Sequence, residues 1–343
     1  MVFNTTSAEV LDRSMSVSTH SALLKQILYG AIGAVLGFGF YILGYKRLIE
    51  FSPVFLILTT FLLVLVFVPG IGQEINGARR WISIAGFSFQ PSEFAKYMIP
   101  IYFIHWRLKQ KEISLFSFCK IMAILCMPLG LILLEPDNGT TAMILVTLVV
   151  LFLLTRVRWV YWAVPLMIVV GGGIGAASQM PHVSDRIRVY LNPEQDLMGK
   201  GHQPYQAKIA AGSGGVWGKG LGKSMQKLNY LPAARSDYIA AIFAEEFGFA
   251  GMVVLISTYL TLALTGFTIA FRARDREGFY LASFLTFLIA FQSFLNLGVA
   301  SSLLPSKGTT LPFFSHGGSS LLVNLIALFL IFNIAKSART KFA

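Results

Sequence analysis

The sequence predicts an all-α polytopic membrane protein, and three observations carry this prediction. Of the 343 residues, 55% are hydrophobic and only 13% are charged, against roughly 25% charged residues in soluble domains. The mean hydropathy is +0.67. Apolar runs recur along nearly the whole chain and alternate with short polar segments, which is typical of a helical bundle surrounded by lipid. We therefore expect a single integral membrane domain over residues 1–343.

The membrane spans follow from the lengths of the apolar runs. A helix rises about 1.5 Å per residue and the hydrocarbon core is about 30 Å thick, so one span takes roughly 20 apolar residues. The candidate spans are Leu23–Leu43, Pro53–Pro69, Ser92–Trp106, Phe116–Leu134, Gly139–Leu154, Trp159–Ser178, Tyr238–Phe271, Phe279–Ser301 and Ser319–Ile334. The Tyr238 run is long enough to include an interfacial turn.

The basic residues predict the orientation of these spans. The net charge is +12, but the Lys and Arg residues form no single basic patch, so we expect no nucleic-acid partner. Instead they cluster in every second loop, which the positive-inside bias places in the cytoplasm. These basic clusters are Lys46–Arg47, Arg107–Lys111, Arg156–Arg158, Arg272–Arg276 and Lys336–Lys341. The long loop over residues 178–237 and the Leu303–Gly318 loop are then outside the cytoplasm.

The long outer loop is the first candidate for a functional region. It includes the glycine-rich stretch Gly199–Gly222, and loops of this length in a compact domain are usually functional or disordered. Interleaved apolar residues such as Trp217 and Tyr230 argue against disorder and favour short helices on the membrane surface.

Asp237 lies where this loop re-enters the membrane at the start of a helix, with Glu245 and Glu246 two turns deeper. A partly desolvated carboxylate is suited to accept a proton, so Asp237 is a candidate general base. The alternative is an aspartate that caps a helix whose glutamates are hidden against neighbouring segments.

Polar residues near other span ends are candidates as well, because polar groups in a membrane need partners or a water-filled cavity. Glu93 and Lys96 lie three residues apart on one helical face. They form either a binding site or a pair of charges that neutralise each other. Arg79 and Arg80 precede Trp81, where a guanidinium can meet lipid headgroups or bind a phosphate.

Two further residues have two interpretations each. Asp137 lies in the tight turn Glu135–Thr140, where it either caps the next helix or joins a polar site. Lys307 lies in the Pro- and Gly-rich outer loop. It is either a residue that contacts an anion or an ordinary lysine at the membrane interface. The five scattered histidines and the two cysteines do not have metal-binding spacing.

Seven motifs in order resemble the SEDS family of bacterial peptidoglycan polymerases over nearly the whole chain. They are GARRWI, QPSEFAK, EPDNGT, LNPEQD, GSGGVWGKGLGKSMQKLNYLPAARSDYI, AEEFGFAG and LLPSKGTTLPFFSHGGSS. Within the family, KSMQKLNYLP and LLPSKG resemble the cell-division branch more than the elongation branch. The resemblance implies a ten-helix bundle that polymerises lipid II, a disaccharide-pentapeptide on undecaprenyl diphosphate, at the outer face of the cytoplasmic membrane during septal cell-wall synthesis.

The resemblance also implies roles for individual residues. The family's essential loop aspartate falls on Asp237. Residues that line or brace the family's outward cavity fall on Arg79, Glu93, Lys96, Asp137, Arg186, Glu245 and Lys307. The chain departs from the family at Arg235-Ser236-Asp237-Tyr238-Ile239, where the usual residues are HTDFI, and at His316, where a tyrosine is usual. Met1–Ala8 is similar to the end of the family's first helix, so we expect the chain to begin inside that span.

The partners and the rival functions follow from the same resemblance. It implies a class B penicillin-binding protein that crosslinks the new strand, together with other proteins of the division machinery. The sequence requires no cofactor, and a divalent cation on the substrate diphosphate is compatible with it. A lipid II flippase and a non-catalytic division scaffold are the alternatives. Against a flippase, no inverted repeat is evident and the ionisable residues gather at the outer face.

Overall fold

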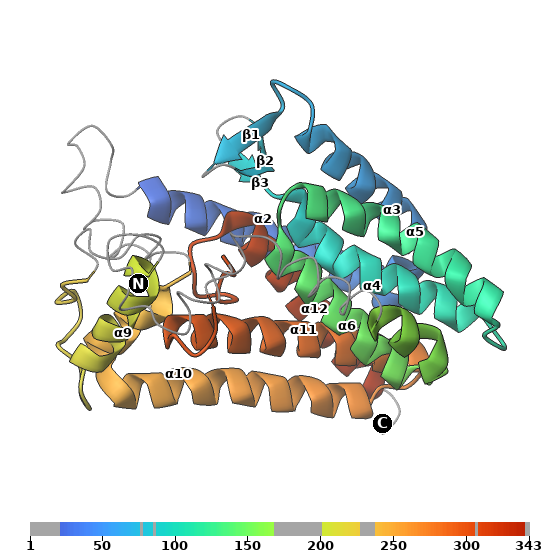
Figure 1. Ribbon diagram of the computed structural model, residues 1–343. Coiled ribbons are helices and arrows are strands. Elements are labelled where there is room, and N and C mark those ends of the chain that lie inside the picture. Colours follow the sequence, from blue (N-terminus) through green and yellow to red (C-terminus); the bar gives the residue numbers. More distant parts are fainter. Residues whose placement is uncertain are drawn as a thin grey trace. The chain divides into compact units, whose positions relative to one another are not determined.

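The computed structural model describes residues 21–75, 78–84, 87–167, 201–226, 237–305 and 308–339. This part of the chain contains helices and a small sheet (Figure 1). In chain order the elements are α2 (Ser21–Leu43), α3 (Tyr45–Val66), β1 (Gly72–Ile75), β2 (Ala78–Ile84), β3 (Phe87–Phe89), α4 (Pro91–Lys109), α5 (Leu115–Leu134), α6 (Asn138–Leu154), α9 (His202–Ser213), α10 (Ile239–Phe271), α11 (Arg276–Ala300) and α12 (Gly318–Arg339).

The described helices confirm six of the nine predicted spans. Six helices in the described residues are long and apolar enough to cross a membrane, namely α2, α3, α5, α10, α11 and α12. Helix α6 is apolar but has 17 residues, and α4 begins with the polar residues that the sequence singled out. The predicted span Trp159–Ser178 is helical over 159–167, and the rest of it lies outside the described residues. Helix α3 begins eight residues earlier than the predicted span. The prediction followed the apolar run and therefore left out the first turns, which carry charged residues.

The chain divides into two compact units. We call Tyr29–Pro165, Ala263–Ile289 and Gly318–Ala343 the sheet unit, and Met1–Leu28, Leu166–Leu262 and Ala290–Gly317 the loop unit. The single membrane domain over 1–343 stays a prediction.

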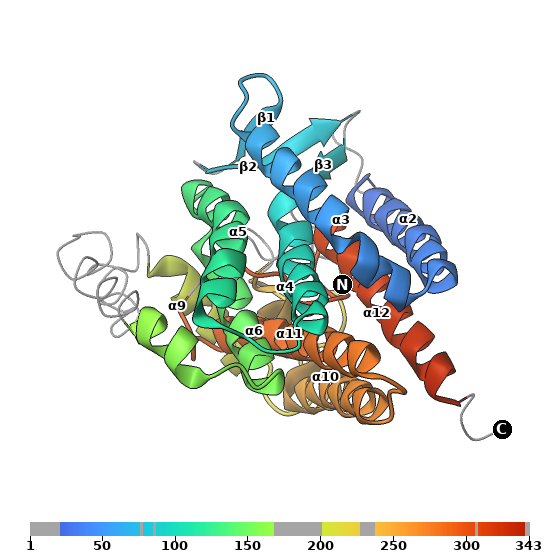
Figure 2. The same cartoon turned by 90° about the vertical axis from the view of Figure 1, so that its right-hand side faces the viewer.

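Helix α4 is central to the sheet unit. It packs against α3 over much of its length and also contacts α5, α6 and α12. Figure 2 shows α2, α3 and α12 side by side. At Gly37 of α2, an added Cβ would lie 2.4 Å from the Phe329 ring of α12. A glycine there allows the close approach of two helices that small residues provide in membranes.

The segment from Gly72 to Phe89, between two of the predicted spans, forms the sheet. Its strands pair antiparallel in the order β1-β2-β3, with a register shift between Gln73 and Glu74. Ala78 and Ile82 of β2 are buried, whereas Arg79 is exposed, so Ala78 and Ile82 face inward. Arg80 lies at the irregularity and has no partner residue on β1.

In the loop unit, α10 is broken at Gly248, where φ is 66° and ψ is −164°. The break lies within the Tyr238 run, which is long enough to include an interfacial turn; its position at the interface stays a prediction. The glycine-rich segment after α9 pairs with the backbone groups around the break. Lys219 N donates to Glu245 O at 3.0 Å and Gly220 N to Glu246 O at 2.9 Å, while Phe249 N donates to Gly215 O at 2.9 Å. Irregular backbone in a membrane protein is stable only where such groups find partners.

Candidate functional site

Asp237 lies two residues before α10, close to the helix start that the sequence predicted. Ile242 N donates to Tyr238 O at 3.3 Å, and this four-residue spacing makes Tyr238 the cap residue of the helix. Asp237 is therefore one residue outside the helix, and its carboxyl is not at the capping position. Tyr238 and Ile239 are buried, which anchors the turn on which Asp237 is carried.

Two segments of the loop unit approach Asp237. From α11, Asn296 Nδ2 donates to the Asp237 carbonyl at 3.0 Å. From the loop before α12, Gly308 has a φ of 65°, and a Cβ added to it would lie 3.7 Å from Asp237 Oδ2. Because Gly308 has no side chain, its backbone comes close to the carboxyl group.

Glu245, a second candidate in the loop unit, is completely buried and anchors the glycine-rich segment. Its carboxylate accepts from Lys219 Nζ at 2.6 Å and from Ser224 Oγ at 2.5 Å. It also accepts from the backbone N–H groups of Met225 and Gln226, each at 3.3 Å. These contacts fit the interpretation in which the helix hides its glutamates, and they give Glu245 a bracing role within the loop unit.

The sheet unit holds a separate group of predicted residues on α4. Lys96 Nζ lies 2.8 Å from Glu93 Oε2, and both residues are buried. Pro91 opens the helix at its first turn, a position that suits proline because its missing N–H has no helical partner there. A buried ion pair of this kind is stable only when both charges are present, because removing one leaves the other uncompensated.

Asp137 is the N-cap of α6, as one of the two interpretations predicted, and it also belongs to a polar cluster. Its carboxylate accepts from Thr140 N at 3.2 Å and from Thr140 Oγ1 at 2.9 Å. Gln90 Nε2 and Ser92 Oγ, at the start of α4, each donate to its Oδ2 at 3.2 Å. Asp137 therefore joins the beginnings of α4 and α6.

Arg80, and not Arg79, is the guanidinium of this cluster in the structure. Arg80 Nε donates to the Glu135 carbonyl at 2.9 Å and Nη2 to the Pro136 carbonyl at 2.6 Å. Its Nη1 lies 3.8 Å from Asp137 Oδ1. Arg79 is on the opposite face of β2, where it is exposed and pairs with Glu74 at 3.2 Å. The role of Arg79 in substrate binding stays a prediction.

Glu135, which the sequence analysis did not select, is buried in the same turn. It is 1% exposed, and neither carboxyl oxygen has a hydrogen-bond partner among the described residues. Burial raises the pKa of its carboxyl to about 8, and the nearby Asp137 charge acts in the same direction while Arg80 opposes it. Glu135 is therefore largely neutral at pH 7, because loss of its proton would leave a buried and unpaired charge.

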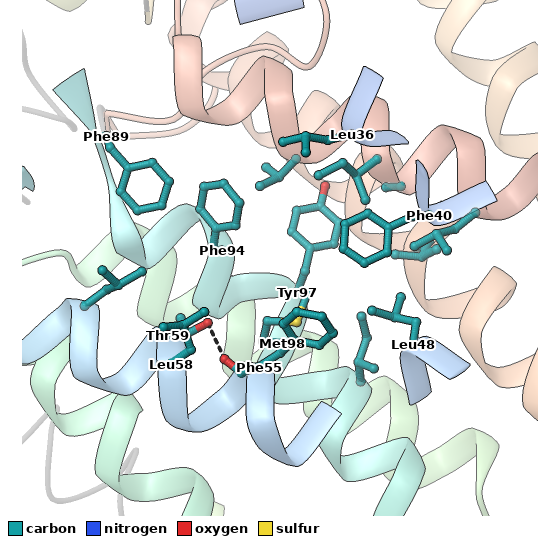
Figure 3. A pocket seen from close by; sticks show the side chains of 17 residues that line it. Leu36, Phe40, Leu48, Phe55, Leu58, Thr59, Phe89, Phe94, Tyr97 and Met98 are labelled. Carbon is teal, nitrogen blue, oxygen red and sulfur yellow. Dashed lines mark hydrogen bonds between the residues drawn. The ribbon is translucent and has the colours of Figure 1, made fainter. Parts of the chain in front are cut away.

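An apolar cavity of about 230 Å³ lies among α2, α3, α4 and α12 of the sheet unit. Phe89, Phe94 and Tyr97 line it from one side, and Leu36 and Phe40 of α2 contribute from another (Figure 3). Its two hydroxyl groups are already bonded, Thr59 Oγ1 to the Phe55 carbonyl at 2.7 Å and Tyr97 to Asn324 Oδ1 at 2.6 Å. The remaining lining suits a hydrocarbon chain.

The structure thus places Asp237 and Glu245 in the loop unit and brings Glu93, Lys96 and Asp137 into the sheet unit. Arg186 and Lys307 lie outside the described residues. Glu135 and Asn296 were missed by sequence reasoning, which named Arg80 beside Arg79 as a guanidinium that could bind a phosphate. Nothing local distinguishes Asn296 from other polar residues of an apolar helix.

Comparison with known proteins assigns the family. The family model FTSW_RODA_SPOVE, described as "Cell cycle protein", matches residues 1–340. The chain is 36% identical to the Probable peptidoglycan glycosyltransferase FtsW of Trichlorobacter lovleyi, over 91% of this chain and 83% of that protein. It is 36% identical to the Stage V sporulation protein E of Bacillus subtilis, over 92% and 87%.

Solved structures agree with this assignment. A chain of a peptidoglycan synthase complex that coordinates polymerization and crosslinking matches with a TM-score of 0.78 at 25% identity, over 98% of this chain and 95% of that one. The rod shape determining protein RodA of Thermus thermophilus matches with a TM-score of 0.67 at 26% identity, over 98% and 91%. The protein is a multi-pass membrane protein and belongs to the FtsW/RodA/SpoVE family, the SEDS family that its motifs resembled.

Proposed function

We propose that this protein is a peptidoglycan glycosyltransferase that polymerises lipid II at the outer face of the cytoplasmic membrane. The position of Asp237 carries the proposal. It lies two residues before the first residue of a membrane helix, its carboxyl lies close to Gly308, and its turn is held by α11. The names of the relatives support the reaction type.

In this mechanism Asp237 is the general base. It takes the proton from the 4-hydroxyl of the acceptor sugar as that oxygen attacks the anomeric carbon of the donor. The bond from this carbon to the diphosphate breaks, and undecaprenyl diphosphate leaves with the electron pair. One displacement inverts the configuration and needs no covalent enzyme intermediate. General-base assistance contributes about 10² to 10⁴ in rate.

Charge stabilisation of the departing diphosphate is the second requirement. We assign it to Arg186 and Lys307, which the family resemblance selects, and the sheet-unit cluster at Glu93, Lys96 and Asp137 to the binding of substrate. Among the described residues no group of three or more His, Cys, Asp or Glu could hold a metal ion. A divalent cation on the substrate diphosphate is compatible with this mechanism.

The apolar cavity supports a lipid-linked substrate. It lies on α4, the same helix that carries Glu93 and Lys96, and its lining offers no free hydrogen-bonding group. Apolar surface of this kind favours part of a polyprenyl chain over a soluble sugar nucleotide.

We further propose a role in septal synthesis with a class B penicillin-binding protein as partner. FtsW relatives at 36–39% identity support the division role, although a sporulation protein is equally similar. The related chain in a peptidoglycan synthase complex supports a crosslinking partner.

The test uses the purified protein with its partner and fluorescent lipid II in detergent, with glycan length read on a gel. Wild type should make polymer, and Asp237→Asn, which keeps the shape of the side chain but removes the base, should make at least about 100-fold less. Glu112→Gln, at an exposed position, is the matched control and should behave as wild type.

Absence of polymer from wild type, or full activity of Asp237→Asn, would overturn the proposal. A flippase would instead move lipid II across vesicles in a parallel assay without joining sugars, and a scaffold would do neither.

A further inference from the structure

Asn296 of α11 connects two segments that are far apart in the sequence. Its side-chain amide has two N–H groups, and Nδ2 donates to the Asp237 carbonyl at 3.0 Å and to the Thr309 carbonyl at 2.5 Å. Asn296 is fully buried, so water does not compete for these hydrogen bonds. One side chain therefore holds the Asp237 turn and the loop before α12 together.

A second residue of α11 extends this connection. Gln292 lies one helical turn before Asn296, on the same face. Its Nε2 donates to the Thr310 carbonyl at 2.8 Å and to Thr310 Oγ1 at 3.2 Å. The two amides thus hold consecutive residues of the loop, and Gly308 at the adjacent position is the residue beside Asp237 Oδ2.

Only an amide of this length provides two donors and no charge at such a site. Asparagine is also costly here, because Asn296 Oδ1 is buried and has no hydrogen-bond partner within the part of the chain that the structure describes. Leaving a buried polar atom unsatisfied costs about 1–3 kcal/mol. An apolar residue would avoid that cost, so the value of Asn296 lies in the two bonds that it donates.

We infer that Asn296 is a positioning residue, which fixes the Asp237 carboxyl relative to the loop at Gly308 during glycosyl transfer. This inference rests on the proposed role of Asp237 as base. A displacement of about 1 Å in a catalytic group lowers the rate by about 100-fold. Loss of the two bonds should therefore reduce kcat, while lipid II binding elsewhere leaves KM unchanged.

The test compares Asn296→Asp with Asn333→Asp in the polymerisation assay with the partner, over pH 5.5 to 8.5. Asn333 is the matched control, because its Nδ2 donates to the Tyr41 carbonyl at 2.7 Å and its Oδ1 accepts from Tyr45 N at 3.1 Å. Both variants exchange a bridging amide for a carboxyl group. Rates are divided by the wild-type rate at each pH, which corrects for the pH dependence of the wild-type enzyme.

We expect Asn296→Asp to have a kcat about 10–100-fold below wild type at pH 8, with KM within about twofold. Its relative rate should rise as the pH falls, because a protonated carboxyl donates one hydrogen bond and a carboxylate donates none. Asn333→Asp should keep the wild-type rate at every pH. A wild-type kcat for Asn296→Asp, or the same loss at every pH, would overturn the inference.

Asn296→Ser covers the case in which the aspartate variant does not fold. Serine has one donor and a shorter reach, so kcat should fall about tenfold or more with no pH-dependent recovery, and a wild-type rate would again overturn the inference. Asp237→Asn in the same assay separates the two proposals. If it is inactive while the Asn296 variants are fully active, only the positioning role fails; if it is active, the proposed base fails.

Discussion

The ammonium group of Lys219 lies 2.6 Å from the carboxylate of the buried Glu245. Lys219 belongs to the glycine-rich segment and Glu245 to the part of α10 just before its break at Gly248. The backbone of the same segment bonds to the carbonyls of Glu245 and Glu246. The ion pair therefore holds the glycine-rich segment against α10, at the point where backbone N–H groups of the segment replace the helical hydrogen bonds that are missing at the break.

Substitution of Lys219 should loosen this segment locally. Lys219→Gln leaves the Glu245 carboxylate buried without its cation, which costs about 1–3 kcal/mol of local stability. A loss of about 1.4 kcal/mol changes the equilibrium constant for local opening about tenfold. Hydrogen exchange at the backbone amides of positions 219 and 220 should therefore become about tenfold faster or more. Hydrogen–deuterium exchange with mass spectrometry measures this rate.

Lys223→Gln is the control for this prediction, because Lys223 is an exposed lysine of the same segment and its ammonium group has no ion pair within the described residues. Equal exchange rates in the two variants would show that the ion pair does not hold the segment.

The pair formed by Glu93 and Lys96 gives a prediction about stability and activity together. Lys96→Met strands a buried carboxylate, which costs about 3–5 kcal/mol, whereas Glu93→Gln combined with Lys96→Met removes both charges and should recover most of that stability. Thermal unfolding in detergent measures the recovery. If the pair also binds substrate, as we propose, the double variant should be stable but inactive in the polymerisation assay. A stable and active double variant would restrict the pair to a structural role.

Much of the fold could be predicted because hydropathy and length alone determine which segments cross a membrane. The ends were less accurate. Helix α3 begins at Tyr45, before its apolar run. The predicted span began later because Lys46 and Arg47 in the first turn interrupt the apolar pattern. The sheet was missed because β1 and β3 are short and β2 carries two adjacent arginines.

The candidate site was predicted only in part, for a related reason. Asp237 could be selected because it falls at the boundary between a long loop and an apolar run. Asn296 could not, since its contact with Asp237 spans 59 residues of sequence and depends on how helices pack. The choice between Arg79 and Arg80 depended on the face of a strand that was not predicted.

Gly308 should be required for activity more than for stability. Its φ of 65° is unfavourable for other residues, so Gly308→Ala should cost about 1–2 kcal/mol. The new methyl group would also occupy the space 3.7 Å from Asp237 Oδ2, and the polymerisation rate should fall by about tenfold or more. Gly70→Ala is the control, because Gly70 has a φ of 88° with nothing within 4 Å of an added Cβ. Equal rates for both variants, after comparable losses in thermal stability, would show that the space at Gly308 is not used.

Glu135 makes the stability of the protein depend on pH. The pKa of its carboxyl is about 8 in the folded protein, against an ordinary value of 4.5. Because the folded state binds this proton more tightly, the contribution to stability is complete below pH 4.5 and is lost as the pH rises through 8. Each unit of difference in pKa corresponds to about 1.4 kcal/mol of stability.

Glu135→Gln is permanently neutral and should remove this dependence on pH, so the variant should match wild type near pH 5 and unfold at a higher temperature near pH 8. Thermal unfolding in detergent across this range measures the difference, with Glu112→Gln as control. Parallel curves for wild type and Glu135→Gln would mean that Glu135 is ionised in the folded protein.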